Sequence, residues 1–205
     1  MSGNYLRKDY LYQQAKTDGY RSRAAYKLLE LNKKFAFLKR GASILDLGCF
    51  PGGWLQVAMQ KTSPSGVVVG ADIKEVEAVE FHGGSAVIYQ ADVFSGDFLG
   101  KLHTHFPSGV DVVLSDMSPQ LSGIAFRDAL LSAELVERSF ELARETLRDN
   151  GTVVAKIFPG QEAEDVVKKA RMTFKKVTRE HLSSTRRTSN EFYIVAQGIK
   201  DRGSR

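Results

Sequence analysis

A glycine-rich turn is the segment of this chain best suited to bind a small ligand. Residues 46–54 read Asp-Leu-Gly-Cys-Phe-Pro-Gly-Gly-Trp and separate a short apolar run from a helical pattern. Glycine allows a sharp turn and a close backbone approach at a helix N-terminus, where N–H groups are free. The G-x-x-x-G-G spacing lacks the dinucleotide pattern and the Walker lysine, which disfavours NAD and ATP. The turn residues expected to contact a cofactor are Gly48, Pro51, Gly52, Gly53 and Trp54.

Acidic residues follow several of the apolar runs. Asp72 is placed to accept hydrogen bonds from ribose hydroxyls, and Asp92, with Val93 beside it, is placed to accept one from an adenine amino group. Together they predict a nucleoside ligand without a pyrophosphate, a description that S-adenosylmethionine fits. The alternative is a turn built only for packing, with the aspartates capping helices.

Short apolar runs alternate with amphipathic stretches along the chain and must position these residues. The runs predict strands, the stretches predict helices, and continuous apolar strands are typical of a parallel sheet covered on both faces. We therefore expect an open α/β fold whose ligands bind beyond the carboxyl ends of the strands. The expected strands are 43–47, 67–71, 86–89, 110–114, 152–157, 175–181 and 192–196, and the expected helices are 22–37, with Ser22 as N-cap, 53–61, 129–147 and 162–171.

Charge is distributed unevenly along the chain. Residues 1–40 hold ten Lys/Arg against three Asp/Glu, and residues 168–187 hold eight against one. Residues 41–167 hold eight against eighteen, so two basic segments flank an acidic middle. This asymmetry indicates a polyanionic partner, with nucleic acid the leading candidate and a merely solvated surface the alternative.

Composition excludes several classes of protein. With 205 residues, 42% hydrophobic and 26% charged, the sequence is typical of a globular protein, and we expect one domain over 1–200 with a flexible tail at 201–205. The single cysteine, Cys49, and apolar runs well short of ~20 residues argue against disulfide-stapled and membrane proteins. Residues 1–20 lack the apolar region of a secretory signal, so we place the protein in the cytoplasm. The four histidines lack a metal-binding spacing, and no metal is expected.

Five segments carry a more specific pattern. They are Arg21-Ser-Arg-Ala-Ala-Tyr-Lys-Leu28, the turn at 46–54, Ser115-Asp-Met-Ser-Pro-Gln-Leu-Ser-Gly123, Val154-Ala-Lys-Ile-Phe158 and Ser189-Asn-Glu-Phe-Tyr193. In this order they resemble the FtsJ/RrmJ family of ribose 2′-O-methyltransferases, from about residue 12 to residue 198. The resemblance implies a Rossmann-like methyltransferase fold: a seven-stranded, mostly parallel sheet with an antiparallel last strand and helices on both faces. The sequence departs from the family at Cys49 and Phe50, where two small residues are usual, and at Ser118 and Gln120, where Ala and Asn are usual.

The resemblance also implies a Lys-Asp-Lys-Glu tetrad at Lys27, Asp116, Lys156 and Glu191. Methyl transfer from a sulfonium to a hydroxyl is an in-line displacement that holds the donor carbon and the acceptor oxygen ~3 to 3.5 Å apart. A lysine is a base only when neutral, and an unperturbed lysine titrates near ~10.4. Lys27 favours the neutral form of Lys156, whereas the two carboxylates favour its charged form. We expect Lys156 to accept the proton or stabilise the alkoxide, Asp116 to orient Lys156 beside the methyl donor and to contact the cofactor, and Lys27 and Glu191 to position the ribose.

The basic segments adjoin the expected site, because Lys27 lies in the first of them and Glu191 follows the second. The expected phosphate contacts, which would make binding salt-dependent, are Arg21, Arg23, Lys33, Lys34, Arg186 and Arg187. Tyr10, Tyr12 and Tyr20 are candidates to stack on unpaired bases, with a core or surface role equally open.

These expectations describe a monomeric RNA ribose 2′-O-methyltransferase that uses S-adenosylmethionine. The resemblance favours a uridine in large-subunit ribosomal RNA, and a ribose in a transfer RNA anticodon loop is the second candidate substrate. Two other classes stay open. The intact tetrad argues against a non-catalytic RNA-binding assembly factor of the ribosome, and the glycine spacing argues against a nicotinamide-dependent oxidoreductase.

Overall fold

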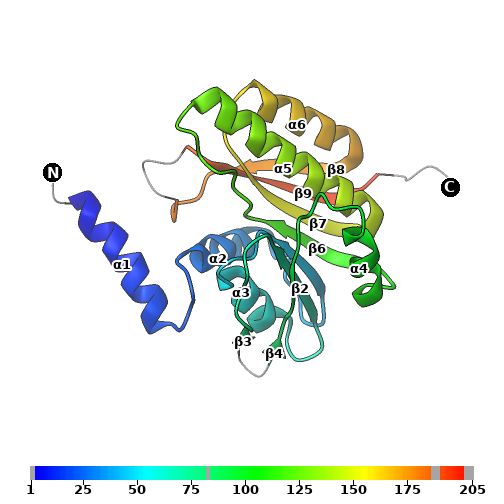
Figure 1. The fold of residues 1–205 in the computed structure, drawn as a ribbon, viewed down its shortest axis with the longest axis horizontal. Helices are drawn as coiled ribbons and strands as arrows, with labels where there is room; N and C mark the ends of the chain where they lie inside the picture. Colours follow the sequence, from blue (N-terminus) through cyan, green and yellow to red (C-terminus); the bar gives the residue numbers. More distant parts are fainter. Residues whose placement is uncertain (1–2, 82–83, 186–189, 201–205) are drawn as a thin grey trace.

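A seven-stranded sheet forms the centre of the protein. The computed structural model describes residues 3–81, 84–185 and 190–200, and Figure 1 shows helices on both faces of the sheet. The strand order is β5-β2-β1-β6-β7-β9-β8, and β9 pairs antiparallel with both of its neighbours. The predicted Rossmann-like sheet with an antiparallel last strand is therefore confirmed. Its strands are β1 Ser43–Leu47, β2 Val67–Asp72, β5 Val87–Gln90, β6 Val110–Ser115, β7 Leu147–Ile157, β8 Phe174–Glu180 and β9 Phe192–Ile199.

Successive residues of the strands pack against opposite helical layers. Ile44 of β1 packs in the layer that contains α2 (Ala24–Phe35) and α3 (Gly53–Thr62). Its neighbour Leu45 packs in the layer of α4 (Phe98–His105) and α5 (Ala125–Thr146), with α6 (Gln161–Thr173) beside α5. Burial on both faces is why these strands are continuously apolar.

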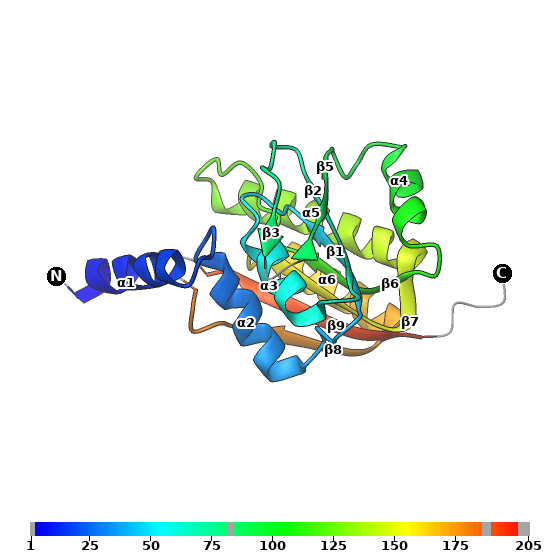
Figure 2. The same ribbon diagram turned by 90° about the horizontal axis from the view of Figure 1, so that it is seen from below.

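The N-terminal region differs from the prediction. A first helix, α1 (Gly3–Thr17), projects from the body in both views (Figures 1 and 2). It was not expected, because its sequence shows no apolar periodicity. The expected N-cap at Ser22 is wrong: α2 begins at Ala24, and the hydroxyl of Ser22 has no hydrogen-bond partner in the described structure. Ser22 instead packs against Gly53, where a Cβ would come within 2.4 Å of the serine Oγ.

Other boundaries shift by a few residues. Helix α5 ends at Thr146, so Leu147 belongs to β7, and α4 and a two-stranded ribbon of β3 (Glu80–Phe81) and β4 (Gly84–Ser85) were not expected. Among the described residues, we find neither a helix able to cross a membrane nor a group of His, Cys, Asp or Glu side chains able to hold a metal ion.

Parallel pairing brings the carboxyl ends of four strands to one edge of the sheet. Leu47 at the end of β1 is in register with Ala71 of β2 and with Ser115 of β6, and Asp72 is in register with Gln90 of β5. The residues that follow these strands are the glycine turn and the loops that begin at Asp72, Asp92 and Asp116. The fold therefore gathers the predicted cofactor residues from four separate segments.

Candidate active site

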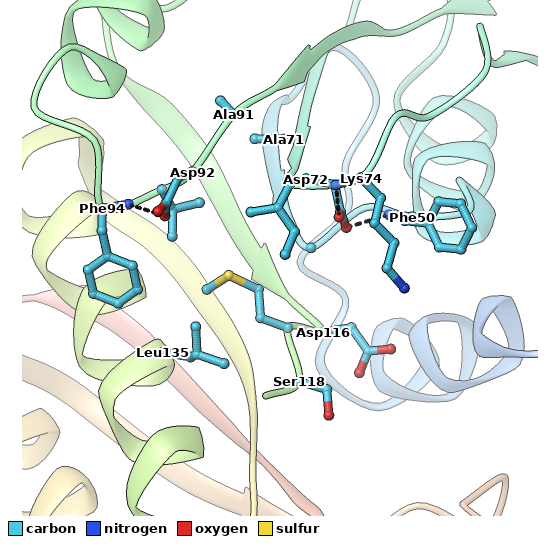
Figure 3. Close-up of a pocket in the computed structure, with 14 residues that line it drawn as sticks. Phe50, Ala71, Asp72, Lys74, Ala91, Asp92, Phe94, Asp116, Ser118 and Leu135 are labelled. Atoms are coloured by element: carbon cyan, nitrogen blue, oxygen red, sulfur yellow. Dashed lines mark hydrogen bonds between the residues drawn. The ribbon is translucent and has the colours of Figure 1, made fainter. Parts of the chain in front are cut away.

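A cavity of about 240 Å³ lies at this edge of the sheet (Figure 3). Five of the residues expected to bind the cofactor line it: Gly48, Asp72, Asp92, Val93 and Asp116. The others, Pro51, Gly52, Gly53 and Trp54, form the turn behind it and the start of α3. Trp54 faces away, since its Nε1–H donates to the carbonyl of Ala24 at 2.8 Å.

The glycine turn is constrained at two positions. Gly48 has φ +75°, and a Cβ there would come within 2.6 Å of the Met117 side chain and 2.9 Å of its Cα. Gly52 has φ +112°, and a Cβ there would approach Val79 to 2.8 Å and Arg21 to 3.2 Å. Only glycine combines these backbone angles with such close packing, so the turn packs directly against Met117, which follows β6, and against the side chains of Val79 and Arg21.

The two aspartates of the cavity also organise its loops. The Asp72 carboxylate accepts hydrogen bonds from the N–H groups of Phe50 and Lys74, each at 2.9 Å, and Asp92 accepts one from Phe94 at 2.9 Å (Figure 3). A carboxylate has about four acceptor positions, so each can still meet a ligand hydroxyl or amino group. Phe50, one of the departures from the family pattern, is half exposed at the rim and lies under the Lys74 ammonium at 4.9 Å.

Asp116 and Lys156 come together at the end of β6 and on β7. The Lys156 Nζ donates to the Asp116 carbonyl at 2.7 Å and lies 3.1 Å from its Oδ1, and the lysine is only 7% exposed. The hydroxyl of Tyr193 on β9 donates to the same Oδ1 at 2.8 Å. Adjacent strands create this cluster, because Lys156 is in register with Tyr193. Burial and the neighbouring Asp116 raise the pKa of Tyr193 well above its ordinary value, so its hydroxyl remains a donor.

Lys27 and Glu191 form the second half of the tetrad. Lys27 of α2 makes a hydrogen-bonded ion pair with Glu191, which directly precedes β9, and both side chains are largely buried. The Lys27 ammonium lies 5.8 Å from the centre of the Tyr193 ring. Tyr193 therefore touches both ion pairs, and all four tetrad residues gather around it.

A second, larger cavity of about 620 Å³ opens beside Lys27 and Glu191. Ser118 lines this cavity and also the cofactor cavity, so the two meet at the segment that follows Asp116. A donor molecule in one cavity and an acceptor molecule in the other would lie on either side of Ser118, near Asp116, which lines the cofactor cavity and pairs with Lys156. This arrangement suits a group transfer between two ligands.

Two ionisable groups lie under the turn without a place in the tetrad. Asp46 of β1 is 0% exposed, and neither carboxyl oxygen has a hydrogen-bond partner within the described residues. Burial, with Asp116 and Asp72 nearby, raises the pKa of Asp46 well above its ordinary value. Burial likewise raises the pKa of the Cys49 thiol, which makes it a packing residue and an unreactive one.

Comparison with known proteins assigns this site to a family. The profile described as FtsJ-like methyltransferase matches residues 20–199. The chain belongs to the FtsJ-like methyltransferase family. Among its relatives, the ribosomal RNA large subunit methyltransferase E of Methanothermobacter thermautotrophicus is 38% identical over 95% of this chain and 91% of its own length. The enzyme of the same name from Chromohalobacter salexigens is 39% identical over 93% and 90%.

A solved structure agrees with this assignment. The crystal structure from Plasmodium falciparum that is described as a ribosomal RNA methyltransferase superposes with a TM-score of 0.79. It is 28% identical in sequence, and the match covers 89% of this chain and all of the other. The whole sheet and both cavities thus fall within the part of the chain shared with this family.

The basic residues expected to contact phosphate have different surroundings. Arg21 donates to the carbonyls of Pro51, Glu77 and Ala78 at 3.3, 2.8 and 2.6 Å, and Arg23 donates to the carbonyl of Ser184 at 2.8 Å. Lys34 pairs with Glu180 at 2.6 Å, and Lys33 is exposed. Arg186 and Arg187 lie outside the described residues. Contact with RNA stays a prediction for all six.

Three features of the site were missed at the level of sequence. Tyr193 stands two residues after Glu191, and this spacing on one face of a strand was a usable signal. The burial of Asp46 and the carbonyl contacts of Arg21 gave no comparable signal, because both depend on segments distant in the sequence. Tyr20, a candidate for stacking on bases, instead packs against Phe81 and donates to Gln60.

Proposed function

We propose that this methyltransferase transfers the methyl group of S-adenosylmethionine to a ribose 2′-hydroxyl of RNA, and that the RNA is that of the large ribosomal subunit, with a uridine as the target. One observation carries the proposal: Asp116, which pairs with Lys156, lines the cofactor cavity, and this cavity shares Ser118 with a second cavity that Lys27 and Glu191 line. The names of the relatives support ribosomal RNA as the substrate.

The cofactor cavity fits S-adenosylmethionine by its chemistry. Asp72 and Asp92 would bind the ribose hydroxyls and the adenine amino group, while Val93, Ile73 and Leu135 provide apolar walls for the adenine. Bound there, S-adenosylmethionine supplies an electrophilic methyl carbon. Asp116 and Ser118 lie near each other in this cavity (Figure 3), and Ser118 also lines the acceptor cavity.

Lys156 would handle the proton of the acceptor hydroxyl. Its nitrogen already donates to the carbonyl of Asp116 and forms an ion pair with the carboxylate of the same residue. These two contacts hold the amine beside Asp116 and leave a further position, a lone pair in the neutral form or an N–H in the charged form, for the ribose oxygen. Lys27 and Glu191 line the acceptor cavity and would bind the sugar there.

Replacement of Lys156 tests the chemical step. We expect Lys156→Ala to reduce methyl transfer by ~10³-fold or more, while the affinity for S-adenosylmethionine stays within about threefold, because Lys156 does not line the cofactor cavity. Methyl transfer is measured with tritiated S-adenosylmethionine, and affinity is measured by calorimetry. Turnover within tenfold of the wild type would remove Lys156 from the mechanism.

The substrate is tested by mapping 2′-O-methyl groups on total RNA from cells with and without the gene. We expect one ribose of large-subunit ribosomal RNA to lose its methyl group in cells that lack the gene, and purified enzyme to restore it on ribosomal RNA or large subunits from those cells. Loss of a methyl group from transfer RNA alone would replace the ribosomal substrate. An unchanged map would favour a non-catalytic role.

A further inference from the structure

The acceptor cavity has two chemically different parts. Charged side chains of Arg23, Lys27, Asp128 and Glu191 line it. Four apolar residues, which we call the apolar wall, also line it: Leu121 in the loop before α5, Ala125 at the start of α5, and Phe158 and Pro159, which follow β7. The cavity volume of about 620 Å³ lies within the ~300–1,000 Å³ typical of pockets that enclose a small ligand. The charged side chains alone are sufficient to bind a sugar hydroxyl.

The apolar wall continues onto an unusually exposed segment. All residues from 121 to 127 are exposed, among them Leu121 at 63% and Phe126 at 69%. Large apolar side chains gathered at the mouth of a pocket indicate a binding surface, whereas scattered ones do not.

Hydrogen bonds to one carboxylate hold this segment in place. Asp128 accepts from the N–H and the Oγ–H of Ser122 at 2.8 and 2.7 Å and from the N–H of Gly123 at 3.2 Å. These bonds, the one from the Ser122 backbone first, hold the pKa of Asp128 below its ordinary value, so it stays charged. The apolar side chains are therefore presented by an ordered loop, and Asp128 is occupied by the protein itself.

The chemistry of the acceptor nucleotide indicates which of its groups would contact the apolar wall. In a nucleotide the base is attached to C1′, next to the C2′ that carries the acceptor oxygen. A ribose whose 2′-oxygen lies beside Asp116 and Lys156 therefore places its own base in the acceptor cavity. Apolar and aromatic side chains bind the faces of unpaired bases, and the cation Arg23 in the same cavity suits an adjoining phosphate.

We propose that the acceptor cavity holds the whole target nucleotide, with the ribose at the Lys27–Glu191 end and the base against the wall of Leu121, Ala125, Phe158 and Pro159. A base that is stacked in a helix cannot enter such a pocket, so the enzyme takes its target unpaired and turned out of the stack. This inference rests on the proposed ribose methylation.

Truncation of Leu121, at the exposed edge of the wall, tests whether the wall contributes to RNA binding and turnover. Leu121→Ala is expected to lower kcat/KM for the RNA about tenfold and to leave the affinity for S-adenosylmethionine unchanged, since Leu121 does not line the cofactor cavity. Met172→Ala is the matched control, because Met172 is 66% exposed and lies on α6. Equal kcat/KM values for Leu121→Ala, Met172→Ala and the wild type would overturn the proposal.

A crosslink tests the position of the base directly. Ribosomal RNA with the thiolated form of the target base, bound with S-adenosylhomocysteine and irradiated, is expected to crosslink to residues 121–125 or 158–159. A crosslink to any other segment would refute the base-binding wall. Leu121→Ala is also assayed on protein-free RNA and on assembled subunits. If the variant loses activity only on assembled subunits, the wall binds a ribosomal protein and not the base. Failure of the wild type to methylate any RNA would overturn the proposed function and not this assignment alone.

Discussion

At the scale of single residues, Tyr193 links the two ion pairs of the site. Its hydroxyl donates to Asp116, and its ring lies near Lys27 and Trp54. Tyr193→Phe keeps the ring and removes the donor, so we expect kcat to fall about tenfold because Asp116 is held less firmly beside Lys156. The affinity for S-adenosylmethionine should change by less than twofold. Wild-type kcat with an unchanged pH–rate profile would contradict this role.

Asp46 should make stability depend on pH. Its folded-state pKa is raised, so the folded protein binds the proton more tightly than the unfolded chain does. Stability is then lost as pH rises from the ordinary carboxyl value, ~3.9, through the folded-state value, and each unit of difference costs ~1.4 kcal/mol at high pH. Asp46→Asn cannot titrate. In urea titrations, we expect the free energy of unfolding of the variant minus that of the wild type to increase from pH 5 to pH 8. A difference that stays constant with pH would show that Asp46 is ionised in both the folded and the unfolded state.

At the scale of elements, Arg21 ties the segment before α2 to the cofactor turn. It donates to the carbonyl of Pro51 in the turn and to those of Glu77 and Ala78 in the loop after β2. We expect Arg21→Gln to weaken S-adenosylmethionine binding about tenfold without RNA present, because the turn loses its outer support. Arg23→Gln, which loses a bond to Ser184, is the control and should bind the cofactor normally. If Arg21 is instead a phosphate contact, cofactor affinity stays constant and the salt dependence of RNA binding falls.

Strands β1 and β2 were predictable because each is a short, largely apolar run bounded by a glycine or an acid, as at Leu47–Gly48 and Ala71–Asp72. Helix α1 was not, since its residues show no apolar periodicity, and the two-residue strands β3 and β4 are too short to leave a pattern. The capping role expected of Ser22 failed because Gly53, distant in the sequence, packs on that hydroxyl. The motifs located the tetrad, but only the register of β7 with β9 brings Tyr193 to it.

At the scale of the whole molecule, the net charge of +5 should attract RNA most where cations are not already paired within the protein. Lys33 is exposed and Lys34 is paired with Glu180. We expect Lys33→Gln to weaken RNA binding at low salt and to reduce the slope of log K against log salt by about 1, and Lys34→Gln to do less. Lys61→Gln, on the exposed end of α3, is the control. Equal slopes in all three variants would place the RNA elsewhere.

The position of β9 has a consequence for biosynthesis. Strand β8 hydrogen-bonds only to β9 within the sheet, and Glu191 and Tyr193 lie at the start of that strand. In a nascent chain, therefore, neither the edge of the sheet nor the acceptor side can form until residues 191–199 have left the ribosome. Partially translated chains would therefore lack a complete acceptor site and could not modify RNA.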